Sequence, residues 1–262
     1  PILERYNIKV PFYKHIDLYN VFKKRAVLIK SGGFKSYSLK NILKEVGIKD
    51  DKGEIDYNIL KKESFSAEEL SSIETYLKQD LKITKKLWDY LIEKFDNLKD
   101  FISKKDADNF KHLTSSTGAY AYKVFCNELG LEEEYLDIKG NKPYEGAFIL
   151  QPQKDRAYDV LYLDFASLYP MMYVHANLFS SKCDCCGDRD FEKWHGNDMF
   201  KVNGYYCKKK QGRIEELIKK FYLRRKEYKR QKDKREFAIK IALNSLYGIS
   251  AKPAFKHLYS EN

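Results

Sequence analysis

An almost continuous apolar run, VLYLDF at residues 160–165, constrains the fold of this chain more than any other segment. A short apolar run of this kind is typical of a strand that is buried on both faces. A second apolar run, AFIL at residues 147–150, indicates another strand. Buried strands need neighbouring strands and covering helices, so the sequence predicts an α/β or α+β fold with a sheet in its core.

Helical periodicity dominates several other segments. Residues 38–46 place apolar side chains at i, i+3, i+4 and i+7, with Ser38 as the expected N-cap and Gly47 as the stop. Ser66 and Glu69 form a capping-box pattern that opens a helix to about residue 94. A helix is also expected over 115–129, and Pro170 fits the first turn of another. The 262 residues correspond to about two domains, or parts of two, and the polar stretch 99–109 indicates a linker.

Positive charge is concentrated in one part of the chain. Residues 208–240 hold 15 basic and 5 acidic side chains, so they carry +10 of the net charge of +11. The periodicity predicts two basic helices here, over 213–231 and 234–246. So dense a charge favours a polyanionic partner; the alternative is a solvated helix face whose charges form salt bridges.

The cysteines indicate a reducing, intracellular compartment and a metal site. Cys183 and Cys186 have the C-x-x-C spacing of two zinc ligands, and Cys207 and His195 are the nearest candidates to complete a structural Zn²⁺ site. Reduced cysteines in a surface loop are the alternative. No apolar run reaches the roughly 18–20 residues of a membrane-spanning helix, so no membrane partner is expected.

Two groups of polar residues suggest chemistry. Asp164 ends the predicted buried strand, where a carboxylate is costly unless it binds a cation or caps the next helix. Lys240, Asn244 and Tyr247 follow one face of the second basic helix, and Arg225 and Lys229 lie one turn apart on the first. Such stripes of cations, an amide and an aromatic ring are suited to a phosphate and a base.

These segments resemble DNA polymerase family B. DFASLYP at 164–170 resembles the family's motif A, and KIALNSLYG at 240–248 resembles its motif B. Tyr144-Glu-Gly146-Ala147 is similar to the family's Y-x-G-G/A segment, and Tyr76-x-x-x-Asp80 is similar to its third exonuclease motif. The resemblance implies template-directed addition of dNMP to a primer 3′-OH at a two-metal Mg²⁺ site, together with a proofreading exonuclease domain.

The same resemblance implies a role for each matching residue. Asp164 would bind Mg²⁺ with the carbonyl of Phe165, and Lys240 would act with it in catalysis. Tyr169 would be the steric gate against ribonucleotides. The remaining nucleotide contacts would come from Ser167, Leu168, Arg225, Lys229, Lys240, Asn244 and Tyr247. DNA contacts would come from Tyr144, Gly146 and Gly248, and the exonuclease site, with its own Mg²⁺, from Tyr76 and Asp80.

The resemblance also implies a division of the chain. Residues 1–105 would form the C-terminal part of a ribonuclease H-like exonuclease domain. Residues 106–155 would form a linker and the approach to the palm, and 156–182 a partial palm with buried strands and motif A. Residues 183–210 would form a Cys-rich insertion, 211–250 a helical-hairpin fingers region and 251–262 the start of the return to the palm.

Two exonuclease motifs that the family carries before these segments, D-x-E and N-x-x-x-F-D, are missing from the sequence, as is the D-T-D-like carboxylate motif that it carries after motif B. We therefore expect an internal segment that is inactive by itself. The partners implied are primer–template DNA and dNTP, with a processivity factor as a further candidate. The alternative functions are a non-catalytic, zinc-stabilised nucleic-acid-binding protein and a stand-alone exonuclease, of whose site only Tyr76 and Asp80 are present.

Overall fold

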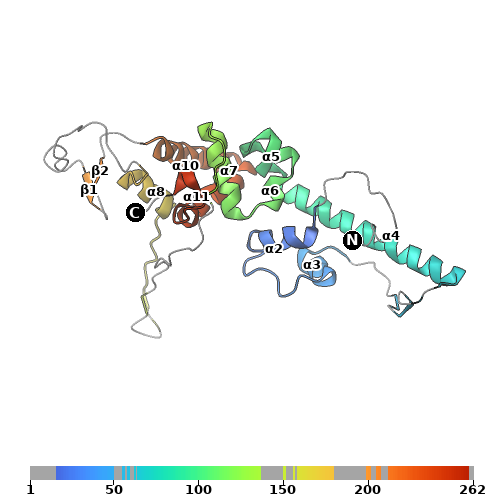
Figure 1. Cartoon of the computed structure of the whole chain (residues 1–262). Coiled ribbons are helices and arrows are strands. Elements are labelled where there is room, and N and C mark those ends of the chain that lie inside the picture. The colour runs from blue at the N-terminus through green and yellow to red at the C-terminus, as the bar shows by residue number, and fades with distance from the viewer. Residues whose placement is uncertain are drawn as a thin grey trace. The chain divides into compact units, whose positions relative to one another are not determined.

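The computed structural model describes residues 16–49, 55–56, 58–59, 62, 64–136, 150–151, 156, 158–179, 199–201, 205–207 and 212–259. Helices make up most of these residues (Figure 1). The chain divides into two compact units, one of residues 1–99 and 104–116, the other of residues 100–103 and 117–262. Within the described residues, no helix combines the length and apolar content needed to cross a lipid bilayer.

Two capped helices come first among the described residues of the first unit. Helix α2 (Leu18–Ile29) is capped by Asp17, whose carboxylate accepts a hydrogen bond from the backbone N–H of Asn20. Helix α3 (Leu39–Val46) is capped by Ser38 and ends at Gly47, whose φ of 76° favours glycine. The cap and the stop therefore lie where the sequence predicts them. The core of these two helices comprises Val21, Phe22, Ala26, Ile42 and Leu43.

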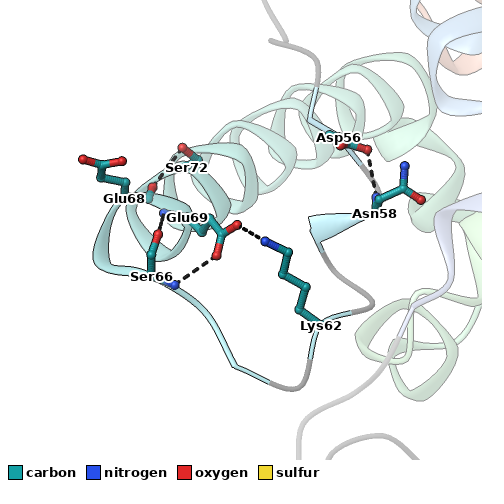
Figure 2. A network of polar contacts seen from close by, with 7 residues as sticks. All are labelled: Asp56, Asn58, Lys62, Ser66, Glu68, Glu69 and Ser72. Carbon is teal, nitrogen blue, oxygen red and sulfur yellow. Dashed lines mark hydrogen bonds and ion pairs between the residues drawn. The ribbon is translucent and has the colours of Figure 1, made fainter.

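Helix α4 (Ala67–Phe95) begins with the predicted capping box (Figure 2). The backbone N–H of Glu69 donates to Ser66 Oγ over 3.1 Å, and the backbone N–H of Ser66 donates to Glu69 Oε2 over 3.0 Å. Lys62 forms an ion pair with the same glutamate over 2.5 Å. The reciprocal bonds satisfy two backbone donors, which fixes where the helix begins. Burial is confined to the second half, on one face formed by Ile83, Leu87, Leu91 and Phe95.

Short helices follow α4, where the sequence analysis expected a linker. These are η2 (Asp96–Phe101), α5 (Lys104–Asp108) and α6 (Lys111–Thr114), so residues 99–109 are largely helical, and the division between the two units falls in this part of the chain. Arg25 of α2 is fully buried and donates to the carbonyl oxygens of His112 (2.5 Å) and Leu113 (3.3 Å). A charged side chain thus satisfies carbonyl groups of a helix too short to satisfy its own.

The described residues of the second unit form four α-helices. They are α7 (Thr117–Leu129), α8 (Leu168–Ala176), α10 (Arg213–Gln231) and α11 (Arg235–Ser250), with η3 (Lys256–Leu258) after them. The predicted basic helices are confirmed as α10 and α11, and Pro170 lies in the first turn of α8 as expected. Helix α11 packs against α7, α10 and α8. The buried core of the second unit includes side chains from α7, α10 and α11: Tyr120, Val124, Phe125, Leu217, Ile218, Phe221, Ile239, Ala242, Leu243 and Leu246.

Two contacts show how closely these helices pack. Phe125 of α7 meets Phe221 of α10 edge to face, with ring centroids 5.5 Å apart. A Cβ atom built on Gly118 of α7 would lie 2.9 Å from Cγ2 of Ile249 on α11. The hydrogen of glycine is therefore needed at the α7–α11 crossing.

The segment after α7 returns to pack against the C-terminal residues. Tyr135 forms an isolated antiparallel bridge with Phe255, and the hydroxyl of Tyr122 donates to the carbonyl oxygen of Glu134 over 2.8 Å. Burial raises the pKa of Tyr122 to about 12. The first contact holds the segment after α7 against the segment after α11, and the second holds it against α7 itself.

The predicted fold class is wrong for the part of the chain that the structure describes. Residues 160–165 are extended but belong to no strand, and Val160 to Leu163 each expose at least 69% of their surface. An extended segment becomes a buried strand only where another strand supplies hydrogen-bond partners. Among the described residues, the strands are β1 (Met199–Lys201) and β2 (Tyr205–Cys207), which pair antiparallel. No ribonuclease H-like sheet or palm with buried strands is formed by the described residues, and the strand expected at 147–150 lies, except for Leu150, outside them.

Candidate functional site

The two segments that carry the sequence motifs meet in the second unit. Tyr169, in the first turn of α8, stacks on Tyr247 of α11. The two ring centroids are 4.8 Å apart, and the angle between the ring planes is 24°. The centroid distance lies in the range of favourable aromatic pairs. Tyr169 nevertheless exposes about half of its surface, so a ligand can still reach its ring.

A buried hydrogen-bond chain fixes α8 against α11. The hydroxyl of Ser250 donates to the carbonyl oxygen of Tyr247 over 3.0 Å. Because a serine hydroxyl has one hydrogen, the 2.6 Å contact between Tyr173 and Ser250 is a bond in which the tyrosine donates. Tyr173 and Ser250 are both buried, so this chain orients the turn of α11 that carries Tyr247.

Ser167 and Arg225 join the beginning of α8 to α10. Ser167 lies in the left-handed region, with φ of 58° and ψ of 46°, a conformation that costs a non-glycine residue about 1–2 kcal/mol. Its hydroxyl accepts a hydrogen bond from Arg225 Nη1 over 3.3 Å. Arg225 Nε also donates to Glu236 Oε1, in the first turn of α11, over 2.7 Å. A single guanidinium therefore touches both motif-bearing helices.

The other end of α8 is attached to the beginning of α10. Asn177, with φ of 54°, accepts a hydrogen bond from the backbone N–H of Gly212 at Oδ1 over 3.2 Å. Glu215 of α10 is fully buried and accepts a 2.6 Å bond from the backbone N–H of Phe179. A carboxylate in a first helical turn is also favoured by the helix dipole. These bonds orient α10 relative to α8.

Some of the cations on the basic hairpin are paired and others are exposed. Glu128 of α7 meets Lys220 at 3.4 Å and Arg224 at 3.0 Å. By contrast, Lys229 of α10 and Lys240 of α11 are exposed. Neither of their side chains forms a hydrogen bond or ion pair within the described ranges. The hairpin is therefore a salt-bridged face in part, while other cations remain open to an anionic ligand.

The structure brings only some of the predicted site residues into contact. Ser167 contacts Arg225, and Tyr169 contacts Tyr247. Asn244 is exposed on α11, Gly248 has nothing within 4 Å of a Cβ built on it, and Leu168 begins α8. Asp164 and Phe165 lie in the exposed segment before α8, and the predicted exonuclease pair, Tyr76 and Asp80, lies one turn apart on α4 of the first unit. Tyr144, Gly146, Cys183, Cys186 and His195 lie outside the described residues, as does the side chain of Cys207.

The described side chains form no metal site by themselves. No group of three or more His, Cys, Asp or Glu side chains that could hold a metal ion occurs in the described ranges. Asp164 therefore supplies one exposed carboxylate, which is fewer ligands than a two-metal centre needs.

Several residues that make these contacts were not predicted from the sequence. Glu236 lies one turn before Lys240 on the same helical face, so the periodicity of that stripe could have included it. Ser250, Tyr173 and Asn177 carry no such signal, because their contacts are made across the fold.

The comparisons with known proteins show the family of this chain. A sequence profile described as DNA polymerase family B matches residues 89–260, which include both motifs and the helices α7, α8, α10 and α11. The chain belongs to DNA polymerase family B.

Similar proteins carry polymerase names. The chain is 28% identical over 261 residues to the DNA polymerase delta catalytic subunit of Plasmodium falciparum (isolate K1 / Thailand), covering 89% of this chain and 23% of that protein. It is 23% identical over 271 residues to the DNA polymerase of Desulfurococcus sp. (strain Tok), covering 95% and 33%. The chain thus spans about a quarter to a third of the length of these relatives.

A solved structure shares the fold. The structure of the family B DNA polymerase from the hyperthermophilic archaeon Pyrobaculum calidifontis matches with a TM-score of 0.63 and 18% sequence identity, over 94% of this chain and 33% of that one.

Proposed function

We propose that this chain provides part of a DNA-directed DNA polymerase, which adds a deoxynucleoside monophosphate to a primer 3′-OH and releases pyrophosphate. The contact between Tyr169 and Tyr247 carries this proposal, because it joins the two motif segments that the family uses for the nucleotide. Family membership and the open cations of the hairpin support it.

The proposed nucleotide pocket lies where α8, α10 and α11 meet. Arg225, Lys229 and Lys240 would bind the triphosphate, because phosphoryl transfer needs cations on the charge that develops in the transition state. Tyr169 would lie under the deoxyribose and exclude a 2′-hydroxyl. Asn244 and Tyr247 would line the space for the new base pair, with Ser167 and Leu168 beside the phosphates.

We propose Asp164 as a Mg²⁺ ligand, aided by the carbonyl oxygen of Phe165. Magnesium prefers oxygen ligands, and the exposed Asp164 carboxylate supplies one. Bound Mg²⁺ would stabilise the attacking and leaving oxygens of the reaction. The described residues do not complete a two-metal centre, so further ligands are required.

The other proposed roles concern the first unit and the Cys-rich segment. Residues 1–105 would belong to a proofreading 3′–5′ exonuclease domain, with Tyr76 and Asp80 in its site. Primer–template DNA would contact Tyr144, Gly146 and Gly248, and a processivity factor is a further proposed partner. Cys183, Cys186, Cys207 and His195 would bind Zn²⁺, so metal analysis is expected to find zinc bound to the chain; less than about 0.3 zinc per chain would contradict that site.

Substituting Asp164 tests the polymerase proposal. In the full-length protein, Asp164→Asn is expected to abolish Mg²⁺-dependent primer extension while leaving primer–template binding within about threefold of the parent. Asp159→Asn is the matched control, because Asp159 is an exposed carboxylate in the same segment and asparagine tolerates its φ of 55°. Undiminished extension by the Asp164 variant would refute the assignment.

A further inference from the structure

Two protein groups hold the guanidinium of Arg225. Its Nε donates to Glu236 Oε1 over 2.7 Å, and its Nη1 donates to Ser167 Oγ over 3.3 Å. The side chains of Arg225 and Glu236 are 21% and 22% exposed, so the ion pair is largely shielded from water. An ion pair in such surroundings is stronger than one on the open surface.

These contacts leave part of the guanidinium unused. Arginine has five N–H donors, one on Nε and two on each terminal nitrogen. Within the described ranges, Nη2 and the second hydrogen of Nη1 contact no acceptor. The edge between the two terminal nitrogens matches the spacing of two phosphate oxygens. A phosphate can therefore bind Arg225 without displacing Glu236.

A second reading is that Glu236 competes with the phosphate for Arg225. A competing carboxylate would be expected to contact the terminal nitrogens, as Glu227 contacts Nη2 of Arg230 over 2.5 Å. The contact of Glu236 is to Nε alone. It therefore fixes the plane of the guanidinium and leaves the phosphate-binding edge open.

We propose that Glu236 is a positioning residue for nucleotide binding, which holds Arg225 in the orientation that accepts a phosphate of the incoming nucleotide. This inference rests on the proposed function of Arg225. Glu236 itself does not touch the nucleotide. Its contribution is to restrict the arginine before the nucleotide arrives, which reduces the entropy that binding would otherwise cost.

Nucleotide kinetics of the full-length protein test the inference. Glu236→Ala is expected to raise the KM for dNTP in primer extension by about tenfold, with kcat within about threefold of the parent. Glu236→Gln keeps an oxygen that can accept a hydrogen bond from Nε, so its KM for dNTP is expected to lie within about threefold of the parent value. Glu227→Ala removes the same charge from an exposed pair of the hairpin and is expected to leave KM unchanged.

Three outcomes would overturn the inference, and they differ in what else they refute. If Arg225→Ala raises KM but Glu236→Ala does not, Glu236 does not position the arginine, and the proposed function of Arg225 stands. If Glu236→Ala lowers KM, the carboxylate competes with the nucleotide. If Arg225→Ala leaves KM unchanged, the assignment of Arg225 in the proposed function fails, and the role of Glu236 fails with it.

Discussion

Tyr169 of α8 and Tyr247 of α11 stack with their ring centroids 4.8 Å apart, although they belong to motifs far apart in the sequence. The buried bond between Tyr173 and Ser250 supports this pair from one side, and the Ser167–Arg225 bond lies at the N-terminal end of α8. Contacts between α8 and α11 are therefore the structural feature on which the proposed nucleotide pocket depends.

Sugar discrimination is expected to depend on the Tyr169 ring. Tyr169→Ala removes the side chain that would exclude a 2′-hydroxyl, so relative use of ribonucleotides is expected to rise by about tenfold or more. The measurement is the ratio of kcat/KM for dCTP and CTP in primer extension by the full-length protein. Tyr247→Phe keeps the ring stack and serves as the control, and an unchanged ratio in Tyr169→Ala would count against the steric role.

Packing between α7 and α11 is expected to depend on Gly118. Gly118→Ala places a Cβ atom 2.9 Å from Ile249 Cγ2, so the helices must shift or the isoleucine must change rotamer. Overpacking of this kind costs about 1–3 kcal/mol, measurable as a lower free energy of unfolding in urea. A double-mutant cycle with Ile249→Ala should show a coupling, because the second change removes the clashing methyl group. Additive effects would show that the two side chains do not meet.

Stability is expected to fall between pH 7 and pH 5 because of His112. Burial lowers its pKa to about 4, and its ring nitrogens form no hydrogen bond with described residues. Below pH 6.5 the unfolded chain takes up a proton that the folded chain does not, so stability is present above that pH and is lost as pH falls toward 4. The expected loss is about 2 kcal/mol from pH 7 to pH 5.

Urea unfolding at the two pH values measures this loss. The window lies above the range in which carboxylates with lowered pKa values, such as Glu45 and Glu69, contribute. His112→Leu should remove the dependence, since leucine does not titrate. The same pH dependence in the variant would show that another group causes it.

Substitution of Gly248 is expected to raise the stability of α11 and to weaken DNA binding. A Cβ atom at this position meets nothing within 4 Å, so Gly248→Ala is expected to stabilise α11 by about 1 kcal/mol. If DNA approaches the helix there, the same methyl group should weaken primer–template binding by about tenfold, measured by fluorescence anisotropy with the full-length protein. Improved stability with unchanged primer–template binding would show that Gly248 does not contact DNA.

Local interactions account for what the sequence predicted correctly. The caps at Ser38 and Ser66, the stop at Gly47 and the two basic helices depend on residues within a few positions of one another. Family membership was also evident from short motifs, and the family profile confirms it. The roles of the individual site residues remain predictions.

The sequence by itself therefore determined the helices, their ends and the family, because these depend on local hydrogen bonds and side-chain order. Only the tertiary structure decided that residues 160–165 are exposed, that residues 96–101 and 104–108 are helical and that Arg225 binds both Ser167 and Glu236. An apolar run indicates that burial is favourable but does not supply the partner strand that burial requires. Likewise, a bond between α8 and α10 depends on how helices pack, and local residue patterns do not specify it.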